Sequence, residues 1–296
     1  MCFLETNVKN DIAFIIVRFI TLVKGIYAIL FVWLFCFIKQ VFSNAEIDVR
    51  KLVFFASFIL LRNKFKLREG FIMSSQETVK YEEMSSFFNE RAEGYEAHMR
   101  ETVNSFETYY DLISCSIEET DKEVEILDLG CGTGLEIEGI FKKAPNARIT
   151  CIDMSEQMLE ILLEKYKSKK GQINIIKDSY LSHSFGVKRY DYVISVMTMH
   201  HFVYDEKKRL YEKIRSAVKD GGRYIEGDYV VSQENEEKWL KEYYEAYEKY
   251  GLEASKLYHI DIPFSIETQK RLLKEAGFTE FELVFKEGEH TIYFAE

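Results

Sequence analysis

The stretch that most constrains the fold is residues 125–134, an apolar run followed by three glycines at alternate positions, Glu-Ile-Leu-Asp-Leu-Gly-Cys-Gly-Thr-Gly. An apolar run bounded by a turn signal predicts a buried strand. Apolar residues then recur at roughly helical spacing from Leu135 to Phe141, so the stretch predicts a strand, a tight loop and a helix. Glycines let the backbone approach a ligand closely. The free N–H groups at the start of the helix favour an anionic ligand group.

The composition is that of a globular protein whose charge is unevenly distributed. Hydrophobic residues make up 47% of the chain and aromatic residues 15%. The first 72 residues carry ten basic and five acidic groups, whereas residues 73–296 carry 29 basic and 44 acidic groups, a net charge of −15. Such an acidic body repels phosphate backbones and argues against broad nucleic-acid binding. The five cysteines form no C-x-x-C pair, which fits a reduced, cytoplasmic protein.

Residues 1–72 differ from the rest of the chain and allow two hypotheses. Residues 12–38 are strongly apolar, but Arg18 and Lys24 interrupt them, and the uncharged run Gly25–Ile38 is shorter than the about 20 residues of a bilayer span. The segment is therefore membrane-associated, or translation starts at Met73 and the segment is absent from the native protein. An intact mass of 34.9 kDa for the native protein would exclude the second hypothesis. We expect no chemistry from this segment, and membrane contact only if it is translated.

The spacing of the glycines distinguishes between two kinds of nucleotide site. A dinucleotide-binding loop has the pattern G-x-G-x-x-G, but position 135 is Leu here, which disfavours a dehydrogenase. Asp128, Gly130, Gly132 and Gly134 instead match (D/E)-x-G-x-G-x-G, and the stretch resembles motif I of the class I S-adenosylmethionine-dependent methyltransferases. The resemblance covers about residues 80–296. It implies that Asp128, the three glycines and Cys131 bind the cofactor.

The family resemblance also implies a fold and a reaction. The fold is an α/β, seven-stranded Rossmann-like methyltransferase sheet of order 3-2-1-4-5-7-6, with strand 7 antiparallel and helices on both faces. The reaction is in-line displacement at the sulfonium methyl group of S-adenosyl-L-methionine, which leaves S-adenosyl-L-homocysteine. The resemblance requires no metal.

A second motif follows the next predicted strand, Arg148–Ile152. Asp153 ends this strand, and a carboxylate there can accept both ribose hydroxyls. Met154 suits packing on an adenine ring. Ser155 is predicted to cap the following helix, just as Ser265 is predicted to cap a later one. Residues 152–159 resemble the second motif of the same family, although a helix N-cap is the simpler interpretation of Asp153.

Further cofactor contacts are implied by the resemblance alone. Asp178 and Ser179 follow the third predicted strand, where the family commonly meets the adenine amino group; a solvated loop is the alternative. Arg91 lies in a segment that resembles the family's cofactor lid, where it is expected to face the methionyl carboxylate; a surface helix is the alternative. Met197 follows the fourth predicted strand, Tyr190–Val196, at the edge where open α/β sheets bind ligands.

Four side chains are candidates for the acceptor side of the site. His200 and His201 follow Met197, and the resemblance places them near the transferred methyl group, where one of them is a candidate base. Asp228 and His259 are weaker candidates, with an ordinary strand end and a solvated loop as the simpler interpretations. Two adjacent histidines do not make a metal site alone, and no partner is spaced along the chain to join them, so no metal ligand is predicted.

The predicted organisation has three parts: the segment 1–72, a helical lid at 73–120 and a methyltransferase core at 121–296. An insertion at about 232–264 is expected to shape the acceptor pocket. Within the core, a helix over Leu210–Val218 is predicted to stop at Gly221 and Gly222, before a strand that starts at Arg223.

The acceptor is predicted to be a small molecule, and three further hypotheses stay open. Residues 262–278 are similar to carboxy-S-adenosylmethionine synthases of tRNA modification, but residues 251–262 contain no arginine for the extra carboxylate. A tRNA-modification enzyme and a non-catalytic S-adenosylmethionine-binding module are the second and third hypotheses. No DNA is expected as a partner, because no Asn-Pro-Pro-Tyr motif follows the fourth strand. The oligomeric state stays open.

Overall fold

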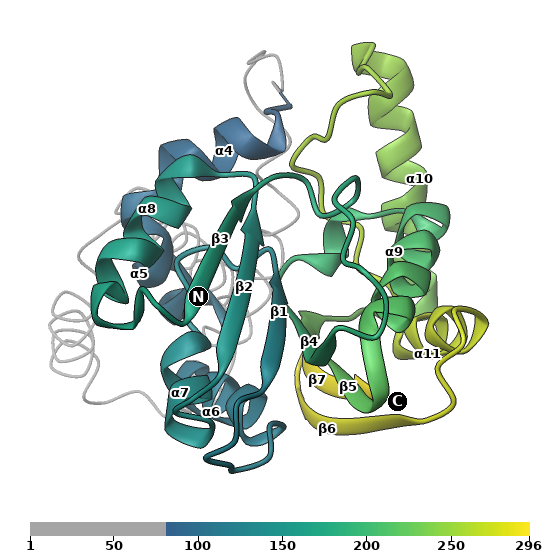
Figure 1. Cartoon of the computed structure of the whole chain (residues 1–296). Coiled ribbons are helices and arrows are strands. Elements are labelled where there is room, and N and C mark those ends of the chain that lie inside the picture. Colours follow the sequence, from purple (N-terminus) through teal and green to yellow (C-terminus); the bar gives the residue numbers. More distant parts are fainter. Residues whose placement is uncertain (1–80) are drawn as a thin grey trace, which may run out of the picture. The chain divides into compact units, whose positions relative to one another are not determined.

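The computed structural model describes residues 81–296, which form one mixed seven-stranded sheet flanked by helices (Figure 1). The strand order is β3-β2-β1-β4-β5-β7-β6, and β7 runs antiparallel to β5 and β6. The predicted sheet is therefore confirmed, while the predictions for residues 1–72 lie outside the described residues. The strands are β1 (Glu125–Leu129), β2 (Arg148–Asp153), β3 (Ile173–Lys177), β4 (Tyr190–Val196), β5 (Val218–Tyr229), β6 (Phe281–Glu287) and β7 (His290–Ala295).

Each face of the sheet carries its own apolar cluster, because parallel central strands are buried on both sides. On one face, Tyr109 and Ile113 of α6 pack with Ile140 of α7. On the other face, Leu210 of α9 packs with Leu272 of α11. The helices of the first face are α6 (Phe106–Cys115), α7 (Ile137–Lys143) and α8 (Glu156–Lys165), and those of the second are α9 (Tyr204–Ala217) and α11 (Ile266–Glu275).

The predicted serine caps are confirmed. The Ser155 hydroxyl accepts a hydrogen bond from the backbone N–H of Met158 at the start of α8, and Ser265 accepts one from Thr268 at the start of α11. Each cap satisfies one of the N–H groups that a helix leaves unpaired at its first turn. Short 3₁₀ turns occur at η3 (Lys167–Lys169) and η4 (Met199–His201).

The predicted helix stop before β5 is wrong. Helix α9 ends at Ala217, and β5 starts at the next residue and runs through both glycines. The pairing of β4 with β5 shifts register between Tyr190 and Tyr192, beside these glycines. A Cβ on Gly222 would lie 2.7 Å from the carbonyl oxygen of Asp191. The glycine therefore permits a close approach of two strands rather than the end of a helix.

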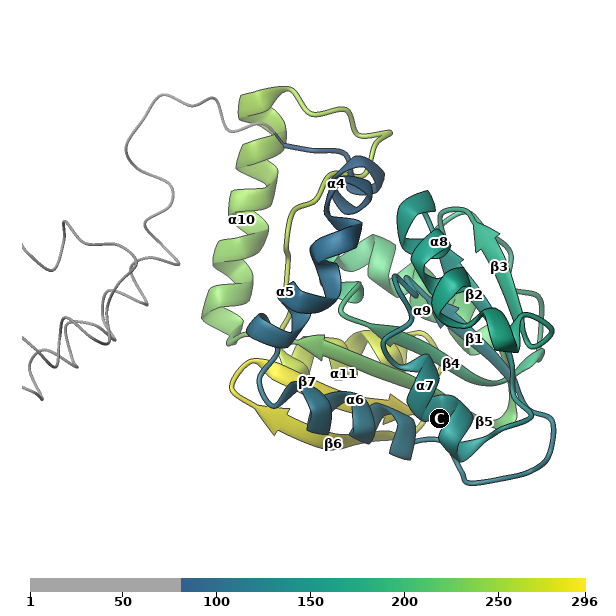
Figure 2. The ribbon, with the colours of Figure 1, turned by 90° about the vertical axis from the view of Figure 1, so that its left-hand side faces the viewer.

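The helices before α6 and the helix after β5 stand at the end of the sheet to which the arrows of the parallel strands point (Figures 1 and 2). They are α4 (Met84–Arg91), the 3₁₀ turn η2 (Ala92–Gly94), α5 (Tyr95–Thr102) and α10 (Gln233–Tyr250). The backbone N–H of Met84 donates to Leu257, and that of His259 donates to Glu82. These bonds join the start of α4 to the loop that follows α10. None of the helices within residues 81–296 is both long and apolar enough to cross a membrane.

Gly139 tests the packing of α7 against α6. A Cβ at this position would lie 2.7 Å from the Cβ of Ser114, so a larger side chain must push the two helices apart. We expect Gly139→Val to lower the free energy of unfolding by about 1–3 kcal/mol, measured by urea denaturation. Gly171→Val is the control, because no heavy atom lies within 4 Å of its built Cβ. Equal losses for the two variants would contradict this packing.

Candidate active site

The glycine loop is fixed by contacts with two neighbouring strands. The N–H of Gly130 donates to the carbonyl of Ile152 on β2 at 2.8 Å. Gly130 has a φ of +67°, and a Cβ there would lie 2.5 Å from Oγ1 of Thr198, just beyond β4. Glycine is therefore required for both its conformation and its lack of a side chain. The loop lies where β1, β2 and β4 end together.

Asp153 ties this loop to the end of β2. One carboxylate oxygen accepts the N–H of Gly132 at 2.9 Å, and the other accepts the N–H of Ser155 at 2.8 Å. Burial raises the pKa of Asp153, and the backbone N–H groups partly offset this rise. Each oxygen keeps a second lone pair, so the carboxylate can still accept hydrogen bonds from a ligand.

A pocket lies over this loop, at the carboxyl ends of the parallel strands. Its volume is about 50 Å³, because Phe88 of α4 and Tyr95 of α5 help to line it. Seven of the predicted site residues also line it: Gly130, Gly132, Asp153, Met154, Ser179, Met197 and His201. The sequence interpretation missed Thr198 and Tyr180, which join the pocket only through the fold.

Asp128 is buried below the loop rather than in the pocket. Its side chain is 1% exposed, and neither oxygen has a hydrogen-bond partner of good geometry among the described residues. Burial and the neighbouring Glu136 raise the pKa of Asp128 well above its usual range, and burial also raises the pKa of Glu136. Two buried carboxyl groups this close favour sharing a proton. The sequence interpretation missed Glu136, whose position after the third glycine was the only available signal.

Two further predicted cofactor residues bind other side chains. Arg91 makes an ion pair with Glu82 at 3.0 Å and lies 3.8 Å from the ring centre of Phe87. Asp178 lies 2.9 Å from Nδ1 of His183. Neither residue lines the pocket, whereas Ser179 does. Their cofactor roles stay predictions. Cys131 and Gly134 lie in the loop, where Cys131 is buried and the Gly134 carbonyl accepts from Tyr166 at 2.8 Å.

The four acceptor-side candidates lie together, and one of them, His201, lines the pocket. Nδ1 of His200 lies 2.6 Å from Asp228, whose other oxygen accepts the backbone N–H of His200 at 3.0 Å. The rings of His200 and His201 are 4.0 Å apart, and those of His201 and His259 are 5.1 Å apart. The expectation that no partner converges on the histidine pair is wrong, because Asp261 lies 3.3 Å from His201.

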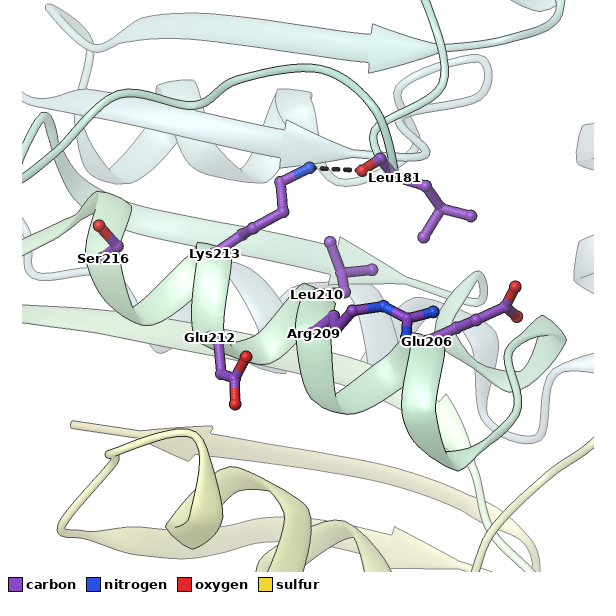
Figure 3. Close-up of a pocket in the computed structure, with 7 residues that line it drawn as sticks. All are labelled: Leu181, Glu206, Arg209, Leu210, Glu212, Lys213 and Ser216. Carbon is purple, nitrogen blue, oxygen red and sulfur yellow. Dashed lines mark hydrogen bonds between the residues drawn. The ribbon is translucent and has the colours of Figure 1, made fainter.

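A larger hollow, of about 560 Å³, lies elsewhere, along α9 (Figure 3). Lys213 donates to the carbonyl of Leu181 across it, at 2.8 Å. The other lining side chains belong to α9 and include both acidic and basic groups: Glu206, Arg209, Leu210, Glu212 and Ser216. None of the residues predicted for the site lies there, so the smaller pocket over the glycine loop is the candidate active site.

Comparisons with known proteins agree with this fold and loop. Residues 126–222 match a family described as a methyltransferase domain. A malonyl-[acyl-carrier protein] O-methyltransferase of Ilyobacter polytropus is 32% identical over 112 residues, which cover 38% of this chain and 42% of that enzyme. A carboxy-S-adenosyl-L-methionine synthase of Nautilia profundicola is 22% identical, over 69% of this chain and 88% of that enzyme. The match to the first relative thus spans less than half of its length.

Solved structures share the fold at low sequence identity. A complex described as DhpI-SAM-HEP has a TM-score of 0.53 and 15% identity, over 76% of this chain and 100% of the other. The CurJ carbon methyltransferase has a TM-score of 0.51 and 15% identity, over 69% of this chain and 58% of the other. Residues 126–222 therefore match a methyltransferase domain, and the described residues share the fold of solved methyltransferase structures.

Proposed function

We propose that this protein transfers the methyl group of S-adenosylmethionine to a small-molecule acceptor by in-line displacement. The acceptor's nucleophilic atom bonds to the methyl carbon, the carbon–sulfur bond breaks, and its electron pair returns to sulfur. The sulfonium supplies the leaving group, so the protein contributes alignment and exclusion of water. The observation that carries this proposal is the pocket in which Gly130, Gly132 and Asp153 lie opposite Phe88 and Tyr95.

The cofactor assignments follow from the positions of these groups. In the proposed complex, Asp153 accepts the ribose hydroxyls and Met154 packs against the adenine. Met197 and Thr198, which line the pocket together with His201, are proposed to face the methionine end of the cofactor. Because α4 and α5 leave little space above the loop, we propose that they move outwards to admit the cofactor and close again over it. This closure would remove water from the reacting atoms.

The acceptor side is proposed to lie at the histidines. Phe88 and His201 line the same pocket, with ring centres 6.1 Å apart. An aromatic wall beside imidazoles suits a compact acceptor with one or two polar groups. His200, His201 and His259 are the candidate proton acceptors, and Asp228 orients His200. A carrier-bound acceptor, such as the malonyl-carrier substrate in the Ilyobacter enzyme's name, is a second candidate, supported only by that partial match.

A carboxy-S-adenosylmethionine synthase is the competing enzyme class, and the relatives so named match over most of their length. Such an enzyme must bind a cofactor with one extra carboxylate. Among the described residues that line the pocket, none is lysine or arginine. An unpaired carboxylate in a largely apolar pocket is costly, so the methyl-bearing cofactor suits this pocket better.

Ligand binding and turnover test the proposal with the full chain. Mass spectrometry of ligand released from purified protein is expected to find S-adenosylmethionine or S-adenosylhomocysteine. A screen of small acceptors should then release S-adenosylhomocysteine, and His201→Ala should slow that release by roughly 10²–10⁴-fold. His98→Ala is the matched control, because His98 is an exposed side chain on α5.

Three results would contradict the proposal, each in a different way. A cofactor heavier by a carboxyl group would indicate the synthase. Tight binding of S-adenosylmethionine without turnover of any acceptor would indicate a non-catalytic module. Binding of NADH in place of S-adenosylmethionine would indicate a dehydrogenase.

A further inference from the structure

The strongest unexplained feature is a cluster of metal-ligand side chains beside the pocket. His200, His201 and Asp261 each offer one ligand atom, and these three atoms lie within 4.8 Å of one another. Oδ1 of Asp261 lies 3.7 Å from Nε2 of His200 and 3.3 Å from Nδ1 of His201. Ligands held about 2.0–2.2 Å from one ion in a tetrahedral site are roughly 3.3–3.6 Å apart. The observed spacing is therefore close to that of a mononuclear site.

The carboxylate oxygen at the centre of this cluster is unsatisfied. Oδ1 of Asp261 is buried, and it has no hydrogen bond of good geometry within residues 81–296. An unpaired buried oxygen costs about 1–3 kcal/mol, more when it is charged. Nε2 of a third histidine, His259, lies 3.9 Å from the same oxygen. Three imidazole nitrogens thus lie within 3.9 Å of one carboxylate oxygen that makes no hydrogen bond of good geometry among the described residues.

The surroundings of His200 match those of a metal-ligating histidine. Such a histidine almost always donates its other ring N–H to a carboxylate or a carbonyl, which fixes the ring and the tautomer. Asp228 provides this contact at Nδ1, 2.6 Å away, and is itself held by the backbone N–H groups of His200 and Tyr229. Nε2 of His200 is thereby left facing Asp261. The side chain of His201 is buried, and its Nδ1 faces both Asp261 and, at 3.4 Å, the carbonyl of Ile260, so this nitrogen must give up the carbonyl contact to bind a metal ion.

We propose that His200, His201 and Asp261 bind one divalent transition-metal ion. Two imidazoles and one carboxylate are the ligand set of catalytic Zn²⁺ and of non-haem Fe²⁺ sites, and both kinds keep open positions. His259 lies at the rim, with its ring stacked on Phe87 at 3.6 Å, and is the candidate fourth ligand. A protonated histidine shared between Asp228 and Asp261 is the competing explanation, but 3.7 Å between Nε2 and Oδ1 is too long for a hydrogen bond.

The proposed metal site suggests the chemical class of the methyl acceptor. This inference about the acceptor rests on the proposed function, whereas the metal site itself does not. His201 belongs both to the metal cluster and to the lining of the cofactor pocket. An ion held there would have its open positions close to the methyl acceptor. We infer an acceptor that coordinates through oxygen, as a hydroxyl or a carboxylate. Metal coordination favours the deprotonated form of a hydroxyl, and because histidines that ligate the ion cannot also accept the proton, the proton passes to water before methyl transfer.

Metal content of the full chain tests the site without any measurement of activity. Protein dialysed against Zn²⁺ or, without oxygen, Fe²⁺ is expected to retain about one ion per chain in elemental analysis. Asp261→Asn should bind the metal ion far more weakly than the wild type. Asp228→Asn should lower the affinity for the ion about 10- to 100-fold, because Asp228 acts on the metal only through His200. Asp261→Asn is the safer first variant, because the Asp261 side chain is 37% exposed and the histidines are buried. His98→Ala should retain the full metal content.

A second readout guards against misfolded variants. Added Zn²⁺ should raise the melting temperature of the wild type but not that of Asp261→Asn, provided that both bind S-adenosylmethionine equally. Co²⁺-loaded wild type should show visible absorption bands that Asp261→Asn lacks. No retained metal in the wild type, or the same content in Asp261→Asn, would overturn the proposal and favour the shared-proton explanation. Bound metal without methyl transfer would leave the site intact and count against the proposed function instead.

Discussion

Asp153→Ala is expected to weaken binding of S-adenosylmethionine by about 10²–10⁴-fold, measured by titration calorimetry. Two hydrogen bonds from ribose hydroxyls to a carboxylate are worth about 1.5–3 kcal/mol each, and a tenfold change in affinity corresponds to about 1.4 kcal/mol. The same carboxylate accepts the N–H groups of Gly132 and Ser155, so its loss also loosens the glycine loop. Both effects act in the same direction.

Asp153→Asn is the intermediate case, because its single oxygen can accept from only one of the two backbone N–H groups and the charge is removed. We expect it to bind more weakly than the wild type and more tightly than Asp153→Ala. Thermal unfolding of each variant checks that the domain is folded. An affinity of folded Asp153→Ala within about threefold of the wild type would refute the ribose assignment, since even one such bond is worth more.

Glu226→Gln is expected to lower the free energy of unfolding by about 3–5 kcal/mol, the largest stability effect that we predict. Lys207 and Glu226 are both 0% exposed, with Nζ 3.8 Å from Oε1. Nζ has no hydrogen-bond partner within the described residues, so Glu226 is its main electrostatic partner. Burial lowers the pKa of Lys207 and raises that of Glu226, and each group opposes the shift of the other.

A double-mutant cycle provides the control for this buried pair. Removing one charge strands the other, whereas removing both removes the cost of burying them. Lys207→Met combined with Glu226→Gln should therefore recover most of the lost stability. The cycle is measured by urea denaturation, with a drop in melting temperature of about 2–4 °C per kcal/mol as a second check. A loss below about 1 kcal/mol in Glu226→Gln would mean that Lys207 is uncharged in the folded protein.

Local sequence chemistry predicted the strands around the cofactor loop, whereas the order of the seven strands was implied by the family resemblance. The buried strand β1, the glycines that follow it and Asp153 at the end of β2 all depend on residues close together in the chain. The serine caps of α8 and α11 likewise depend on one hydroxyl and an N–H group three residues later. The prediction was wrong where two distant strands meet. Gly221 and Gly222 were predicted to end a helix, but they lie within β5, and Gly222 allows β4 to approach closely.

The candidate site, too, could be predicted from the sequence only in part. From the sequence alone, short contiguous patterns predicted the strand, the glycine loop and the helix of the candidate cofactor site, because turn formation and strand burial depend on neighbouring residues. The seven-stranded sheet was implied by the family that these patterns resemble. Only the tertiary structure decided that Asp261 meets His200 and His201 and that Lys207 meets Glu226. It also paired Arg91 with Glu82. These contacts depend on how separate strands, helices and loops pack, and no local pattern records which side chains that packing brings together.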